Sequence, residues 1–292
     1  MLEELRRQAL EGAAEAQFLL GGKYFLGEDL EQDLGEAFRL WSLAAEQGLP
    51  EAQYNVGLAY FDGVGVEPDE RKGLAWILRS AKSGFAPAQF DMGGVHYFGA
   101  RGFERDVAAA VGWWEKAASK GLDTAQYQLG ALYDMGEGVE KDQVKSAFWW
   151  GKAAERGNAL AQHRLGLAYL NGDGVVKDLR RALDLLTQAA DKNVPHAQFH
   201  LGNAYFGSVD PPDHEAAVKY WAMAADQDMP EALLNLGGAY MQGLGAPRDA
   251  ARAVACWKKA ADLGLEEARE NLRQLEKLEK MADPPQGPPL KH

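Results

Sequence analysis

Three patterns in this sequence have the residue types and spacing of a chemical site. The stretch 63–66 reads GVGV and follows a helix-like run, and Gly-rich loops in such places can hold phosphate groups. His196 and His200 are four residues apart, a spacing that puts two zinc ligands on one face of a helix. Seven loops end in an Asp, and loop carboxylates are the usual ligands of calcium. Each pattern can equally be part of a scaffold, so the elements that carry it decide its meaning.

An internal repeat explains the Gly-rich loops. Related loops occur at 136–139, 172–175 and 243–246, and none continues as the GxxxxGK[ST] of a phosphate loop. Each follows the pattern Ala-Gln-aromatic-x-Leu-Gly-x-x-Tyr, or a near variant, which recurs every 35 to 37 residues. The pattern starts at Ala16, Ala52, Ala88, Ala125, Ala161, Ala197 and Ala232, with a partial eighth start at Ala268. A feature present in unit after unit is architecture, so we interpret these loops as turns in which Gly ends a helix in the left-handed conformation.

Each unit is predicted to form two antiparallel helices. The first, helix A, runs from about Pro50 to Phe61 in the second unit. The second, helix B, begins after the loop Asp, whose carboxylate can accept from the free N–H groups of the first turn. These Asp residues are Asp33, Asp69, Asp106, Asp142, Asp178, Asp213 and Asp249. Helix B ends at Gly48, Gly84, Gly121, Gly157 and Gly264, with Asn193 and Asp228 as substitutes. This regular position favours helix caps over calcium ligands.

The tryptophans follow the same period. All eight lie on the B helices, at Trp41, Trp76, Trp113, Trp114, Trp149, Trp150, Trp221 and Trp257. Their regular placement predicts packing between repeats, and Cys256 occupies the same ring of positions as Trp113 and Trp149. We therefore expect these residues to form the core and not a cofactor site.

The repeat resembles the Sel1-like repeat, a relative of the tetratricopeptide repeat. The resemblance rests on A-Q-Y-x-x-G-x-A-Y-x-x-G-x-G-V-x-x-D followed by x-x-x-W-x-x-x-A-A-x-x-G, and it covers residues 13–281. It implies an all-α fold: a right-handed α-solenoid of about seven helix-pair repeats with capping helices, without catalysis. The corresponding domains are a solenoid over 1–281 and a disordered Pro-rich tail over 282–292. The solenoid comprises a terminal helix (1–12), the repeats (13–264) and a C-terminal capping helix (265–281).

In related repeats helix A lines the concave side, which is where the resemblance places a binding groove. Counted from the first Ala of each repeat, positions +3, +6 and +10 form one helical stripe, with +9 at its border. Position +6 is small in most units and +9 is bulky, while +3 varies freely. The predicted partner-binding residues are Phe25, Asn55, Phe61, Asp91, Tyr97, Gln128, Arg164, His200, Phe206 and Asn235.

The histidine pair is the remaining candidate for a metal site. A third zinc ligand would have to come from position +3 of a neighbouring repeat, where Arg164 and Asn235 stand. Neither is a good zinc ligand, and His163 aligns with Tyr54 and other aromatic residues of the packing series. We therefore expect no metal, no cofactor and no catalytic residue.

Composition limits the class of partner and the compartment. The chain of 292 residues has 31 basic and 43 acidic residues and a formal charge of −12, which disfavours nucleic acid and anionic membranes and suits a basic protein. Its single cysteine, Cys256, suits a reducing compartment, and the N-terminal stretch lacks the apolar region of a secretory signal. A cytoplasmic location is expected.

The sequence leaves three functions open. The first is a non-catalytic scaffold or adaptor that holds a segment of a partner protein in the concave groove. The second is an immunity or antitoxin protein, since some Sel1-like proteins resemble immunity proteins and the acidic charge suits a basic effector. The third and weakest is a hydrolase, because Cys-rich relatives have been linked to β-lactams but carry paired cysteines that this chain lacks.

Overall fold

The computed structural model describes residues 2–282, and every regular element in this range is an α-helix. The helices fall into two compact units, residues 1–158 and 159–292. Unit 1 contains α1 (Leu2–Leu10), α2 (Ala14–Leu26), α3 (Leu34–Glu46), α4 (Pro50–Asp62), α5 (Glu70–Lys82), α6 (Ala86–Phe98), α7 (Val107–Ser119), α8 (Asp123–Met135) and α9 (Gln143–Glu155). Unit 2 contains α10 (Ala159–Asn171), α11 (Leu179–Asp191), α12 (Pro195–Gly207), α13 (His214–Ala225), α14 (Pro230–Gln242), α15 (Ala250–Asp262) and α16 (Glu266–Ala282). None of these helices is long and apolar enough to cross a bilayer.

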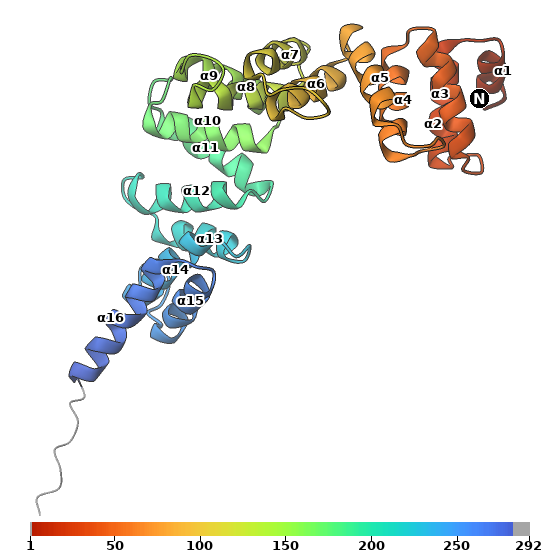
Figure 1. Ribbon diagram of the computed structural model, residues 1–292. Helices are drawn as coiled ribbons and strands as arrows, with labels where there is room; N and C mark the ends of the chain where they lie inside the picture. Colours follow the sequence, from red (N-terminus) through yellow and green to blue (C-terminus); the bar gives the residue numbers. More distant parts are fainter. Residues whose placement is uncertain (1, 283–292) are drawn as a thin grey trace, which may run out of the picture. The chain divides into compact units, whose positions relative to one another are not determined.

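The even-numbered helices α2 to α14 are the A helices and the odd-numbered helices α3 to α15 are the B helices. Within each unit every A helix lies beside the B helix that follows it, and each pair stacks on the next (Figure 1). The helix expected from Pro50 to Phe61 is α4, which ends one residue later. The predicted all-α repeat solenoid is confirmed.

The loop aspartates and glycines have the roles that the sequence indicates. Asp69 caps α5 because its carboxylate accepts from the backbone N–H of Lys72 at 3.0 Å, and the other six aspartates cap their B helices in the same way. Gly63 ends α4 in the left-handed region, with φ 71°. Gly65 has a further constraint, because a Cβ there would overlap the carbonyl oxygen of Leu34 in the preceding repeat. The GVGV stretch is therefore a turn that packs against the neighbouring repeat.

The tryptophans form two groups, and both contribute to the expected packing between repeats. The buried Trp114 lies against Gly93 of its own A helix, where a Cβ would overlap the indole ring. Trp41, Trp150, Trp221 and Trp257 repeat this contact with Gly21, Gly130, Gly202 and Gly237. The small Gly at position +5 lets the A and B helices of one repeat approach closely. Trp41, Trp114 and Trp221 also belong to core clusters that include residues of the next repeat, as the sequence predicts. The half-buried Trp76, Trp113 and Trp149 pack against core clusters that include the preceding repeat.

The Gln of the Ala-Gln pattern joins consecutive repeats. The buried Gln53 donates through Nε2 to the carbonyl oxygen of Ala45 at 3.2 Å, near the end of the preceding B helix. Gln17, Gln89, Gln126 and Gln198 make the same contact eight residues back. Each of these carbonyl oxygens also accepts from the backbone N–H three residues further on, as that of Ala45 does from Gly48, so the Gln amide adds a second hydrogen bond at a buried boundary. The amide explains why this polar residue recurs in a core position.

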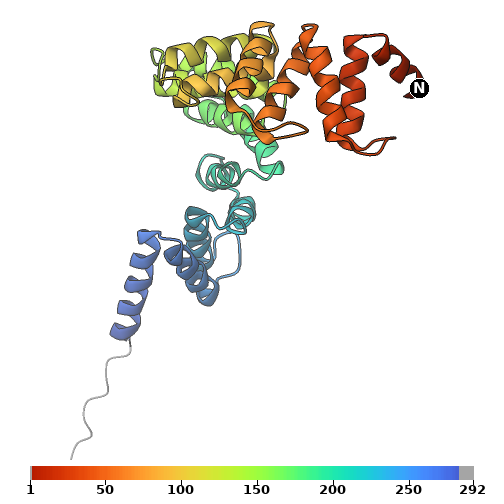
Figure 2. The same ribbon diagram turned by 45° about the vertical axis from the view of Figure 1, so that its right-hand side comes forward.

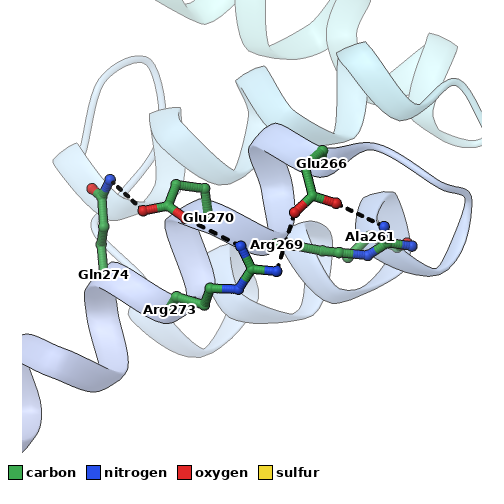
Figure 3. A network of polar contacts seen from close by, with 6 residues as sticks. All are labelled: Ala261, Glu266, Arg269, Glu270, Arg273 and Gln274. Atoms are coloured by element: carbon green, nitrogen blue, oxygen red, sulfur yellow. Dashed lines mark hydrogen bonds and ion pairs between the residues drawn. The ribbon is translucent and has the colours of Figure 1, made fainter.

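The last helix continues this pattern as a cap on unit 2. Leu265, Leu272 and Leu275 pack against the core cluster of the seventh repeat, and Ala268 is buried in it. Arg269 stands where the repeats carry Gln, and it donates to the carbonyl oxygen of Ala261 at 3.0 Å. The outer side of α16 carries an ion-pair network of Glu266, Arg269, Glu270 and Arg273, which keeps the exposed face of the helix polar (Figure 3). The second half of α16 projects beyond the rest of the unit (Figure 2). The predicted disordered tail lies outside the described residues, apart from Ala282.

Candidate functional site

The predicted stripe at positions +3, +6, +9 and +10 of the A helices is called the helix-A face below. Hollows lie along this face in each unit, and the small residues at +6 help to form them. Gly22, Gly94 and Gly238 line a hollow each, and a Cβ at any of the three would meet nothing within 4 Å. The space beside these glycines is therefore open to an incoming group.

The first hollow, of about 290 Å³, lies between α2 and α4 in unit 1. It brings together the predicted residues Phe25 and Asn55. The Phe25 ring packs on Trp41 with 5.4 Å between centroids, which anchors it at the rim. A neighbouring hollow of about 620 Å³ shares Leu26 and Asn55 with it and extends to α1. Two of the predicted side chains thus border an open apolar surface.

The second hollow, of about 400 Å³, is lined by residues of α4 to α8 and of the loop after α6. It brings together four predicted residues: Phe61, Asp91, Tyr97 and Gln128. The Tyr97 hydroxyl donates to a carboxylate oxygen of Glu137 at 3.0 Å, and Glu137 also forms an ion pair with Arg105. This hydrogen bond and burial raise the pKa of Tyr97. Apolar rings and charged groups therefore line one cavity.

The third hollow, of about 380 Å³, lies in unit 2 between α12, α14 and α16. It brings together Phe206 and Asn235. Asn203 links them, because its Oδ1 accepts from the Trp221 indole at 2.9 Å and from the Asn235 amide at 3.0 Å. The Phe206 ring packs on Trp221 with 5.2 Å between centroids. This hollow has no charged residue in its lining.

The remaining predicted residues, Arg164 and His200, do not line these hollows. Arg164 is exposed, while His200 is half-buried and stacks on the buried His163 with 5.3 Å between ring centroids. Burial, and then the nearby His200 and Arg164, lowers the pKa of His163 to about 3. Among the residues that the structure describes, no three His, Cys, Asp or Glu side chains are grouped so as to hold a metal ion. This cluster is described best as packing between α10 and α12.

The structure adds three residues at position +10 that the predicted site omitted. Leu26, Phe98 and Met135 keep 60%, 75% and 58% of their surface exposed, and each lines one of the hollows of unit 1. Their position belonged to the predicted stripe, but the choice of residues rested on the +3 and +9 series. These three residues are recognised by the solvent exposure of their large apolar side chains, which the sequence does not give.

Comparisons with known proteins agree with this architecture. Seven consecutive matches to the Sel1 repeat cover residues 14–49, 50–85, 86–122, 123–158, 159–194, 195–229 and 230–265. The structure resembles c5321, a protective antigen of uropathogenic Escherichia coli, with 32% identity and a TM-score of 0.87 over 94% of this chain. The match spans 59% of the length of that antigen. A Sel1 repeat protein of Oxalobacter formigenes matches with 36% identity and a TM-score of 0.67, covering 93% of this chain and 78% of that protein.

Immunity protein Pa5087 of Pseudomonas aeruginosa is a more distant match. The two proteins are 24% identical, and the match has a TM-score of 0.41 and covers 73% of this chain and 81% of the immunity protein. A TM-score and an identity this low carry no argument about function. A search of curated proteins finds no match. The repeat matches and the two closer structures place this chain in the Sel1 repeat family, whose members typically mediate protein–protein interactions.

Proposed function

We propose that this protein is a non-catalytic adaptor that binds an extended segment of a partner protein along the helix-A face of unit 1. The observation that carries this proposal is the row of Leu26, Phe98 and Met135 beside the hollows. Large exposed apolar side chains beside polar groups are typical of interaction surfaces, and aromatic residues and Met are enriched at interfaces.

The energetics of binding favour this face. Burying a Leu, Phe or Met side chain contributes about 1.5–3 kcal/mol of favourable free energy. Because the three side chains at position +10 are mostly exposed in the folded chain, most of this free energy can still be gained when a partner covers them. Stacked helices also hold these side chains in place before a partner arrives, so little ordering entropy is lost on this side of the complex. A segment that covers the row would contact the hollow lining at the same time.

The experiment compares two triple variants after the partner has been isolated by affinity capture and identified by mass spectrometry. The face variant carries Leu26→Ala, Phe98→Ala and Met135→Ala. The matched control carries Leu43→Ala, Val144→Ala and Phe148→Ala, which truncate exposed apolar residues on B helices. Calorimetric titration should show roughly a hundredfold weaker binding for the face variant and less than about threefold for the control.

Circular dichroism should show the same helix content in both variants, because all six side chains are exposed. Unchanged affinity in the face variant, together with weaker binding in the control, would place the interface on the B helices and overturn the proposal.

A further inference from the structure

The second hollow differs from the other two in its charged groups. Asp91 and Arg101 both line it, together with Phe61, Tyr97 and Phe98. Asp91 stands at position +3 of α6, and it is the only acidic residue at this position in the seven repeats. The third repeat also has one residue more in its loop, which contains Arg101. The hollow is therefore specific to this part of the array.

Asp91 is a carboxylate that forms no ion pair in the described part of the chain. Its Oδ2 accepts from the Tyr54 hydroxyl at 3.0 Å, and none of the ion pairs in the described part of the chain includes it. Burial raises the pKa of Asp91, although the Tyr54 hydrogen bond and the charge of Arg101 act in the opposite direction. A half-buried carboxylate is costly to desolvate, and a neutral hydroxyl offsets only part of that cost.

The aromatic wall of the same hollow already accommodates a guanidinium group. Arg101 adopts a left-handed backbone conformation with φ 57°, and its guanidinium lies over the Phe61 ring, 3.5 Å from the centroid. Its nearest carboxylate is that of Glu70, at 3.8 Å from Nε. Arg101 thus stacks on the wall without forming an ion pair with Asp91, whose charge stays available.

We propose that this hollow binds an arginine side chain from an extended segment of the partner protein, with Asp91 as its counter-ion and the aromatic rings as its wall. The proposal rests on the proposed function and identifies the chemistry of the segment. A planar guanidinium suits both parts of the site, because it can pair with a carboxylate through two donors and stack on a ring face. The formal charge of −12 favours the approach of a basic segment. The volume of about 400 Å³ is within the usual range of pockets for small groups.

The test titrates two capped peptides into the isotope-labelled full chain and follows the amide resonances by NMR. The first is Gly-Gly-Arg-Gly-Gly, and the second replaces Arg by citrulline, which has the same shape without the charge. The arginine peptide should perturb residues around Asp91 and bind at least tenfold more tightly than the citrulline peptide. Equal binding of the two peptides, or no perturbation by the arginine peptide, would overturn the proposal.

The variant Asp91→Asn removes the charge and keeps an oxygen that can accept from Tyr54. It should weaken binding of the arginine peptide at least tenfold. The matched control is Glu115→Gln, which removes an exposed carboxylate from α7, a B helix outside the proposed face, and should change affinity less than twofold. Equal affinity in Asp91→Asn and wild type would refute the role of this carboxylate.

The variant Arg101→Ala should bind the arginine peptide at least as tightly as wild type, because it removes a like charge from the hollow. A tenfold loss of affinity would contradict Asp91 as the main counter-ion.

The failure of this inference can be distinguished from that of the proposed function. If the isolated partner binds Asp91→Asn as tightly as wild type but does not bind the Leu26, Phe98 and Met135 variant, the arginine site is wrong and the adaptor role stands. If the partner binds that triple variant normally, the proposed face is wrong whatever the arginine peptide does.

Discussion

The Tyr54 hydroxyl donates to Asp91 across the boundary between the second and third repeats. His163 and His200 are related in the same way across the boundary between the fifth and sixth repeats. In both pairs the residue at position +2 of one A helix contacts the residue at position +3 of the next. These pairs make the two boundaries chemically different from each other, although the surrounding scaffold repeats.

Replacing Asp91 by Asn should stabilise the free protein at pH 7. Burial raises the folded-state pKa of Asp91 above its unfolded value, so the folded chain holds this proton more tightly. The resulting stability is fully present below the unfolded pKa, near 3.8, and is lost as pH rises through the folded pKa. Urea unfolding at pH 7 should therefore show a higher midpoint for Asp91→Asn and no change for the exposed control Glu115→Gln. A lower midpoint would mean that the carboxylate stabilises the fold.

Replacing His163 by Phe should remove a loss of stability in mild acid. The folded-state pKa of about 3 keeps this side chain neutral, whereas it takes up a proton near pH 6.5 when unfolded. Stability present above pH 6.5 is therefore lost as pH falls towards 3, at up to about 1.4 kcal/mol per pH unit. Phe occupies the same position in α6 and α12, as Phe90 and Phe199, so the ring should fit. At pH 5 the free energy of unfolding of the His163→Phe variant should be about 2 kcal/mol higher than that of wild type. If the free energy of unfolding depends on pH in the same way in variant and wild type, His163 does not cause the loss of stability in mild acid.

Trp114→Ala should cost about 3–5 kcal/mol, as removal of a fully buried ring usually does. The indole lies against Gly93, and its N–H donates to the carbonyl oxygen of Phe90 at 3.0 Å, so truncation removes both packing and a hydrogen bond. Trp113→Ala serves as the comparison, because this ring is half-buried and should cost less. Denaturant unfolding measures both values, and a loss below about 1 kcal/mol for Trp114 would contradict the packing described.

Truncation after Gly264 should lower the unfolding midpoint and the solubility of the protein. It removes α16 and so exposes the apolar face that Leu265, Leu272 and Leu275 cover. Terminal repeats with a polar outer side keep such arrays soluble. The matched control ends at Ala282 and removes only residues 283–292. If both truncations leave the midpoint unchanged, α16 does not stabilise the array.

The regular features of the fold could be predicted because each depends on local sequence. The Asp caps, the glycines that end helices and the helix bounds all follow from residues within one turn. The two groups of tryptophans could not be separated, since Trp113 and Trp114 are adjacent in sequence and only the orientation of the helix decides which meets Gly93.

The candidate site was predictable only as a stripe. The contact between Tyr54 and Asp91 depends on the offset between successive repeats, which the period does not specify. The place of Arg101 over Phe61 depends on the conformation of a loop with one extra residue. Both features require the three-dimensional arrangement, and they distinguish the second hollow from the others.

The most direct test of the adaptor role is photo-crosslinking with a photoreactive phenylalanine at one of two positions. Phe98 lies on the helix-A face and Phe148 on a B helix, and both side chains are more than half exposed, at 75% and 54%. Either replacement therefore keeps an aromatic ring at the surface. After incubation with the partner and irradiation, mass spectrometry should find crosslinks from position 98 and none from position 148. Crosslinks from position 148 alone would contradict the central claim that the partner binds the helix-A face.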